Sequence, residues 1–267
     1  MKLKNKFNIK GSRALITGAA GHLGRVICET LAELGADLIL VDLSYSILKK
    51  QKLSLEKKWR VKVLSYPCDL ESETERKNLI TQIKKDKKTL NILINNAALV
   101  GTSNLPGWAV PFQKQRLPTW RRAMEVNLTS VFHLCQGLAP ILGKKGCGVI
   151  LNISSIYGGL GPDWEVYKGT NMANPAAYAA SKGGLNQLTR WLATTLAPKI
   201  RVNAIAPGGI ERNQPRKFKI QYKAKVPLAR MATEMDFQGA VALLTTPASS
   251  YITGQIVNVD GGWSIKG

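Results

Sequence analysis

Short apolar runs alternate with longer segments of helical period along most of the chain, and this alternation restricts the fold more than any other feature. Such strands and helices form parallel βαβ units, and near-continuous apolar strands indicate a sheet covered on both faces. We therefore expect one domain over residues 1–267, built on a doubly wound parallel sheet of seven strands with helices on both faces. The expected strands are residues 13–17, 36–42, 61–67, 90–98, 148–155, 199–209 and 254–262. The expected helices are residues 22–35, 72–85, 118–142, 176–197 and 233–246.

Residue counts limit the class of protein. No apolar run approaches the roughly 20 residues that span a bilayer, so membrane insertion is not expected. The basic N-terminus is not followed by a signal-peptide apolar core, because its short apolar run leads directly into a glycine-rich turn. Two histidines and the absence of a CxxC pair argue against a metal centre. The four cysteines fit buried thiols in a reducing cytoplasm.

The formal net charge of +21 is the unusual value in the composition. Lysines cluster in residues 47–62 and 83–88, where they fit solvated faces of helices and loops. A nucleic-acid partner is not expected, because no recognition module or set of stacking aromatics accompanies the charge. The alternative is attraction of anionic substrates such as sugar phosphates, nucleotide sugars or lipid-linked glycans.

The string TGAAGHLG follows the first expected strand and opens the first expected helix. Glycines there permit a tight turn and close backbone approach, and a helix N-terminus presents free N–H groups to a pyrophosphate. Asp42 ends the second strand, where its carboxylate can bind an adenosine ribose and would repel a 2′-phosphate. The sequence thus favours NAD as the cofactor, with NADP less favoured; a turn or cap role for Asp42 is the alternative. The turn residues expected to bind it are Gly18, Gly21, His22, Leu23 and Gly24.

A series of motifs in this order resembles the short-chain dehydrogenase/reductase family, in its short single-domain branch with a Rossmann-type fold. The strings are TGAAGHLG, CDL at 68–70, NNAA at 95–98, EVNLTS at 125–130, NISS at 152–155, YAASK at 178–182, NAIAPGG at 203–209 and VDGGW at 259–263. The resemblance implies that NAD also contacts residues beyond the turn, from the adenine end to the nicotinamide: Asp69, Leu70, Asn96, Ala97, Tyr178, Lys182, Pro207, Gly208 and Ile210.

The same resemblance implies a catalytic set of Asn127, Ser155, Tyr178 and Lys182. Asn127 would support a proton-relay water and Ser155 would orient the substrate oxygen, with Ser154 as the alternative if the register is shifted by one. Tyr178 and Lys182 share a helix face at i and i+4. We expect the ammonium, together with a cationic nicotinamide, to lower the pKa of Tyr178 from about 10 so that it can exchange a proton with substrate.

Two features depart from the short branch. His22 replaces its usual middle glycine, and the resulting TGxxGxxG spacing is similar to the extended branch, which includes nucleotide-sugar epimerases and dehydratases. Arg212 stands where a threonine usually contacts the nicotinamide carboxamide, which leaves the contacts of the turn at 207–212 open.

The segment between Ser155 and Tyr178 is longer than is usual in this branch, and we expect it to overhang the substrate; a structural flap or subunit contact is the alternative. Residues 107–122 and 210–231 are two further candidate substrate segments. The strings GPDW and PGGI resemble a subgroup in bacterial surface-polysaccharide and flagellar-glycan biosynthesis, so a carbohydrate derivative is the expected substrate. The tentative substrate residues are Ser155, Asp163, Trp164, Glu165, Asn171 and Tyr178.

These features predict an NAD-dependent oxidoreductase that acts on a sugar, sugar phosphate or nucleotide-sugar hydroxyl. One alternative is a nucleotide-sugar epimerase or dehydratase in which NAD is reduced only transiently. The other is a non-catalytic dinucleotide-binding or nucleic-acid-binding scaffold. The resemblance further implies a homodimer or homotetramer, and the apolar C-terminal residues 251–265 fit a subunit interface. The cysteines make the cytoplasm the expected location.

Overall fold

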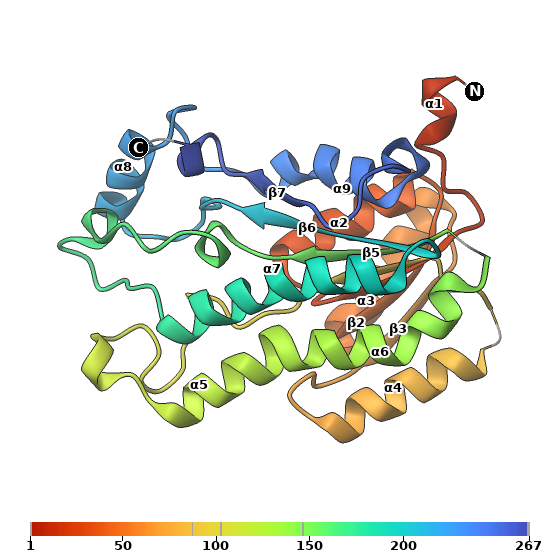
Figure 1. Cartoon of the computed structure of the whole chain (residues 1–267), viewed down its shortest axis with the longest axis horizontal. Coiled ribbons are helices and arrows are strands. Elements are labelled where there is room, and N and C mark those ends of the chain that lie inside the picture. Colours follow the sequence, from red (N-terminus) through yellow and green to blue (C-terminus); the bar gives the residue numbers. More distant parts are fainter. Residues whose placement is uncertain (1, 87, 102, 146, 266–267) are drawn as a thin grey trace.

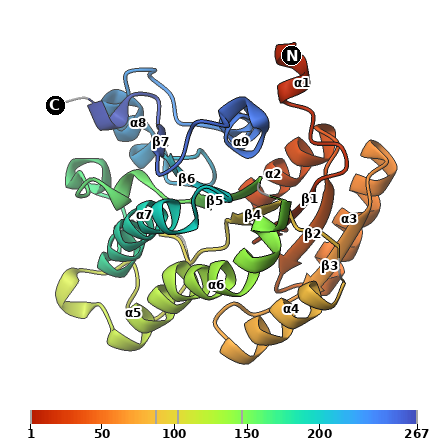
Figure 2. The same cartoon turned by 45° about the vertical axis from the view of Figure 1, so that its right-hand side comes forward.

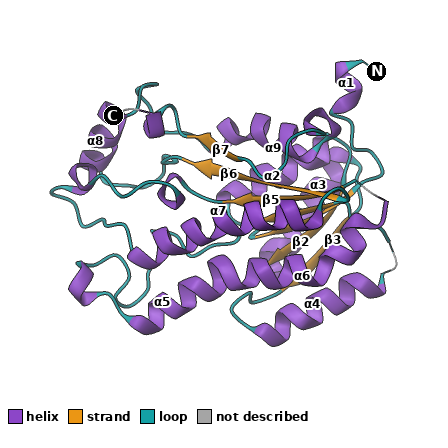
Figure 3. Cartoon of the chain, viewed as in Figure 1, coloured by secondary structure: helices purple, strands orange, loops and turns teal. Residues whose placement is uncertain are grey.

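The computed structural model describes residues 2–86, 88–101, 103–145 and 147–265. Its seven strands form one parallel sheet (Figures 1 and 3). The strand order is β3-β2-β1-β4-β5-β6-β7, and all seven strands are labelled in Figure 2. The order reverses direction between β1 and β4, which creates a crevice at the carboxyl ends of these strands. The strands are β1 (Arg13–Thr17), β2 (Asp37–Asp42), β3 (Val63–Pro67), β4 (Ile92–Asn95), β5 (Gly148–Ile153), β6 (Ile200–Pro207) and β7 (Ile256–Val259).

Helices cover both faces of the sheet (Figure 2), as the apolar strands predict. Helices α2, α3 and α9 pack on one face, and α4, α6 and α7 pack on the other. The expectation of double burial is correct for the inner strands and wrong for the edge strands β3 and β7, whose side chains are partly exposed. The helices are α1 (Leu3–Lys6), α2 (His22–Glu33), α3 (Tyr45–Trp59), α4 (Glu73–Lys85), α5 (Leu117–Met124), α6 (Ser130–Leu142), α7 (Ala176–Leu196), α8 (Arg216–Lys225) and α9 (Gln238–Thr245).

Several elements differ from the sequence prediction. The helix expected over 118–142 is interrupted by a π-helical turn at Glu125–Thr129, and the one expected over 233–246 begins with a 3-10 turn. Helices α3 and α8 are not among the expected helices. They are rich in lysine and bury few side chains, so their sequences carry only a weak apolar period. Cys147 is exposed, which corrects the expectation that all four cysteines are buried. Among the described residues, no helix has the length and apolar character that crossing a membrane requires.

A buried guanidinium joins three segments beside the crevice. Arg76 of α4 is 2% exposed, and it donates to the Leu70 carbonyl, to Nδ1 of His133 (3.1 Å) and to Oε1 of Glu125 (2.6 Å). The π-turn that contains Glu125 is therefore tied to the loop after β3. Removing one partner of such a network leaves the others buried without compensation.

We predict that Arg76→Met lowers the free energy of unfolding by about 3 kcal/mol, the low end for a buried pair because Glu125 is partly exposed. Denaturant unfolding followed by circular dichroism would measure it. Lys77→Met is the matched control on the same helix. It breaks only an exposed i,i+4 pair with Glu73 and should leave the free energy of unfolding close to that of the wild type. Similar losses for the two variants would contradict this account of Arg76.

Candidate active site

A glycine-rich turn between β1 and α2 forms a cradle with room only for backbone. Gly18 has φ +62°, and a Cβ on Gly24 would stand 2.0 Å from the Gly18 carbonyl oxygen. Gly21 precedes α2 as its N-cap, so the free N–H groups of the helix start at this turn. Asn96 fixes the turn from β4 by donating its amide to the carbonyls of Thr17 and Gly18, 3.0 Å each. The geometry fits a pyrophosphate held by the helix N-terminus, as the sequence predicts.

Asp42 lies at the carboxyl end of β2 beside this cradle. Its two carboxylate oxygens accept hydrogen bonds from the backbone N–H groups of Ala20 and Leu43, at 2.9 and 2.8 Å. These contacts hold the carboxylate at the wall of the crevice, where a ribose would meet it. The same contacts also suit the turn role that was the alternative for Asp42.

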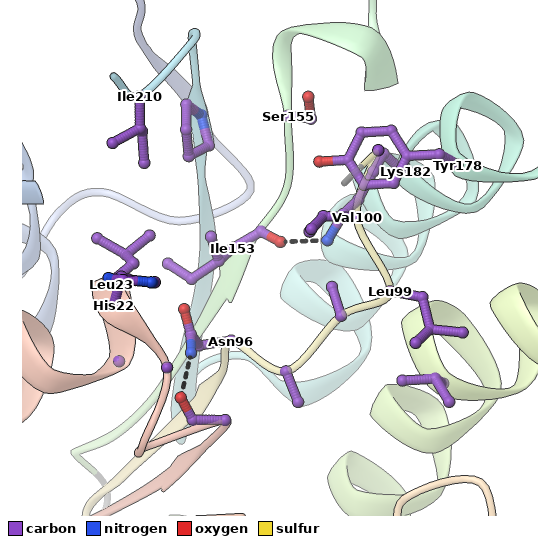
Figure 4. A pocket seen from close by; sticks show the side chains of 18 of the residues that line it. His22, Leu23, Asn96, Leu99, Val100, Ile153, Ser155, Tyr178, Lys182 and Ile210 are labelled. Atoms are coloured by element: carbon purple, nitrogen blue, oxygen red, sulfur yellow. Dashed lines mark hydrogen bonds between the residues drawn. The ribbon is translucent and has the colours of Figure 1, made fainter. Parts of the chain in front are cut away.

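A cavity of about 700 Å³ extends from the cradle across the carboxyl ends of the strands. The glycine-rich turn lies on one side of the cavity, and Ser155, Tyr178 and Lys182 lie on the other (Figure 4). The predicted cofactor residues that line it are Gly18, Gly21, His22, Leu23, Gly24, Asp42, Asp69, Leu70, Asn96, Ala97, Tyr178, Lys182, Pro207, Gly208 and Ile210. The structure thus brings all of these residues to one cavity, although their segments are far apart in the sequence.

Lys182 and Tyr178 project from the first turns of α7 toward the end of β5. The Lys182 ammonium donates a 2.7 Å hydrogen bond to the Ile153 carbonyl and lies 5.8 Å from the centroid of the Tyr178 ring (Figure 4). Ser155 immediately follows β5, and its hydroxyl accepts from the Tyr157 N–H. Ser154 is less suited to substrate, because its hydroxyl donates to Oδ1 of Asn186 at 2.6 Å.

The pKa values of Tyr178 and Lys182 both shift in the protein alone. Burial raises the pKa of the phenol, and a hydrogen bond with Ser155 lowers it by less. Burial also lowers the pKa of Lys182 to about 7. Burial is thus the largest influence on both pKa values in the protein alone, and the lowering that we expect from the ammonium and a cationic nicotinamide together remains a prediction.

Asn127 lies in the π-turn and does not line the cavity. Its amide accepts from the Leu99 N–H (2.7 Å) and donates to the Leu99 carbonyl (3.0 Å) and the Ser181 hydroxyl (3.1 Å). The side chain therefore positions the loop after β4 and the start of α7. Its predicted role in a proton relay remains a prediction.

The predicted substrate residues of the long segment lie outside the cavity lining. The Asp163 carboxylate pairs with Lys225 of α8 at 2.8 Å, and that hydrogen bond lowers its pKa. Trp164 is 56% exposed, Glu165 pairs with Lys168, and Asn171 is exposed. The structure therefore does not bring these four side chains to Ser155 and Tyr178, because they face solvent or α8.

Other side chains of the segment line the cavity in their place, and sequence reasoning missed most of them. They are joined by residues of the region at 210–231, whereas residues 107–122 contribute Arg122 only. Side chains that face the cavity and side chains that face solvent follow no helical or strand period in this turn-rich segment. The sequence therefore carries no signal that distinguishes them. Tyr167 of this segment lines the cavity, and the lining residues that the sequence did not single out include Tyr157, Met172, Asn174, Gln214, Phe218, Tyr222 and Met231.

Comparison with known proteins gives consistent matches over the whole chain. Residues 18–264 match the family model described as enoyl-(acyl carrier protein) reductase. A tropinone reductase homologue of Arabidopsis thaliana is 32% identical, over 100% of this chain and 97% of the relative. The 3-oxoacyl-[acyl-carrier-protein] reductase FabG of Aquifex aeolicus is 30% identical, over 96% of this chain and 99% of the relative. A gluconate 5-dehydrogenase from Burkholderia cenocepacia, solved with NADP and tartrate, is 25% identical with a TM-score of 0.87 over 99% of each chain.

We predict that Gly24→Ala weakens dinucleotide binding by about tenfold or more, because the new methyl group displaces the Gly18 carbonyl and distorts the cradle. Fluorescence titration with the reduced dinucleotide would measure the dissociation constant. Gly239→Ala, on α9 with open space around its Cβ, is the control and should bind like the wild type. Unchanged affinity in Gly24→Ala would remove the cradle from the binding site.

Proposed function

Since the chain belongs to the short-chain dehydrogenase/reductase family of oxidoreductases, we propose that it interconverts a secondary alcohol and a ketone on a carbohydrate derivative, with NAD as cofactor. The observation that carries this proposal is the convergence of Ser155, Tyr178 and Lys182 on the cavity that also contains the glycine cradle. The bound dinucleotide supplies hydride exchange with the substrate carbon.

The residues of this chain would handle the proton and the substrate oxygen. Tyr178 donates its phenolic proton to the oxygen of the forming alcohol, or accepts the hydroxyl proton in the reverse direction. Ser155 donates a hydrogen bond to the same oxygen and orients it. Because burial raises the pKa of Tyr178, the phenol is protonated at neutral pH in the protein alone, which suits carbonyl reduction.

Lys182 would hold the nicotinamide ribose and adjust the charge around the phenol. Its pKa of about 7 means that it can gain or lose a proton near neutrality. The hydrogen bond to Ile153 keeps the amine at the cavity wall in either state.

NAD is favoured by Asp42, whose carboxylate is held at the ribose end of the cavity by two backbone N–H groups. A 2′-phosphate there would meet a negative charge, and the next residues, Leu43 and Ser44, are uncharged. The related gluconate 5-dehydrogenase was solved with NADP, so the choice of dinucleotide in this chain rests on Asp42 itself.

A carbohydrate substrate is supported by the polar groups among aromatic rings at the substrate end of the cavity. A role in surface-polysaccharide or flagellar-glycan biosynthesis rests on the strings GPDW and PGGI. The glycine spacing TGxxGxxG favours a second candidate, a nucleotide-sugar epimerase or dehydratase without net change in NADH. A cavity of about 700 Å³ that must hold a dinucleotide favours a smaller substrate.

We further propose a cytoplasmic homodimer or homotetramer. Large apolar side chains are exposed on helices of one face, including Phe132 of α6 and Trp191 of α7, and at the C-terminus, including Tyr251 and Ile265. Burial of such side chains against a second copy of the chain would remove them from water. Cys28, Cys68 and Cys135 are buried free thiols, which supports a reducing compartment.

Tyr178→Phe should lower kcat by about 10²–10⁴-fold, because it removes the proton donor and keeps the ring. Absorbance of the reduced dinucleotide over a panel of sugar ketones would measure turnover, and titration should give a dinucleotide affinity close to that of the wild type. A variant that retains wild-type kcat would exclude Tyr178 from proton transfer. Product formation by the wild type without net change in NADH would instead support the epimerase or dehydratase.

Asp42→Ser should shift the ratio of kcat/KM for NAD over NADP by about 10- to 100-fold toward NADP, because it removes a charged acceptor and its repulsion of the phosphate. Steady-state kinetics with both dinucleotides would measure this ratio. Asp69→Ser is the comparison, since Asp69 lines the adenine end of the same cavity. If the two variants shift the ratio equally, Asp42 is not the selecting group.

A further inference from the structure

The substrate end of the cavity contains a side-chain amide that the protein leaves unsatisfied. Asn174 is 5% exposed and lines the cavity, yet neither its Oδ1 nor its Nδ2 has a hydrogen-bond partner among the described residues. Buried amides without partners are rare and cost stability. A ligand that completes these hydrogen bonds would explain why the amide lies there.

A pair of phenols lies beside this amide. The hydroxyls of Tyr157 and Tyr167 are 2.7 Å apart, so one donates to the other and the second proton stays free for another acceptor. The Asn174 amide lies within reach of a side-chain hydrogen bond to both hydroxyls, which lowers the pKa of each phenol against the larger effect of burial, although no such contact meets the usual distance and angle limits. Both tyrosines line the same cavity.

The positions of these groups are fixed relative to the reacting end. Asn174 precedes α7 by two residues, and Tyr178 lies in the first turn of that helix. The Tyr167 ring packs on Phe218 of α8 at 5.4 Å between centroids, and Tyr222 of α8 stacks on Trp263 at 4.4 Å. The amide and the phenols are thus parts of a packed wall, which makes them suited to recognition.

The arginine and lysine side chains that line the cavity have partners within the protein. Arg122 is paired with Glu71, and Arg212 is paired with Glu234. Lys182 donates to the Ile153 carbonyl. Near the amide, hydrogen-bonding groups without charge therefore decide which ligand group is bound.

We propose that Asn174, with the Tyr157–Tyr167 hydroxyl pair, recognises a neutral hydroxyl next to the reacting carbon, so that the substrate is an α-hydroxy ketone or the matching vicinal diol. A hydroxyl both donates and accepts, as does the amide. This inference rests on the proposed alcohol–ketone chemistry for the identity of the reacting carbon. It adds that a compound lacking the second hydroxyl is a poor substrate.

The test compares 2-hydroxycyclohexanone with cyclohexanone, which differ only in that hydroxyl, using the enzyme and its reduced dinucleotide. The wild type should show a kcat/KM about 10²-fold higher for the hydroxy ketone, because the amide is left unsatisfied by the other. Asn174→Leu should reduce this ratio by about tenfold or more. Tyr167→Phe should reduce it less, since Tyr157 keeps its hydroxyl.

Two controls separate recognition from folding. Asn104→Leu makes the same exchange at an exposed amide outside the cavity lining and should keep the wild-type ratio. Asn174→Leu should melt no lower than the wild type, because it removes a buried amide without a partner. A lower melting temperature with equal losses on both ketones would show a structural role and overturn the proposal, as would a wild type that reduces both ketones equally.

Binding without turnover distinguishes this inference from the proposed function. Calorimetry on the dinucleotide-loaded Tyr178→Phe variant would compare cyclohexane-1,2-diol with cyclohexanol. Selective binding of the diol that Asn174→Leu abolishes, with no reduction of either ketone by the wild type, would support recognition and count against the proposed alcohol–ketone chemistry on such compounds. Turnover without diol selectivity in either measurement would refute recognition and leave that assignment intact.

Discussion

The burial of Lys182 against the end of β5 is the constraint on which the rest of the site depends. An ammonium group removed from water is costly, and the hydrogen bond to the Ile153 carbonyl replaces only part of its hydration. That carbonyl has a fixed position because β5 lies between β4 and β6 in the middle of the sheet. The lysine can therefore stay buried close to Tyr178, with a pKa of about 7.

This burial also determines how Tyr178 and Lys182 share protons. A phenol with a neutral amine and a phenolate with an ammonium hold the same number of protons, and a dry cavity favours the uncharged pair. The raised pKa of Tyr178 and the lowered pKa of Lys182 are two results of that one preference. A ligand that changes the charge or hydration of the cavity therefore acts on both residues together.

The sequence predicts the strands, the glycine-rich turn and the placing of Ser155, Tyr178 and Lys182 at one cavity, because each has a local signature. Apolar runs mark the strands, and the glycines mark a turn in which Gly24 contacts the Gly18 carbonyl. Prediction from the sequence fails where contacts between distant segments determine which way a side chain faces. Asp163 faces Lys225 of α8 instead of the cavity. Asn174, and not Asp163, lines the cavity because of how the segment packs on that helix, which lies much later in the chain. The i,i+4 spacing likewise gives the distance between Tyr178 and Lys182 but not the extent of their burial.

The two walls of the cavity are built from different parts of the fold. The cradle, Asp42 and Asn96 belong to the first half of the sheet and are joined by hydrogen bonds between side chains and the backbone. The opposite wall is built from the long segment and α8, joined by aromatic contacts such as Tyr167 on Phe218. Side chains on this wall can change without moving the cradle, because the contacts that hold the two walls are different ones. The wall, and Asn174 within it, is therefore where this chain would acquire a substrate of its own.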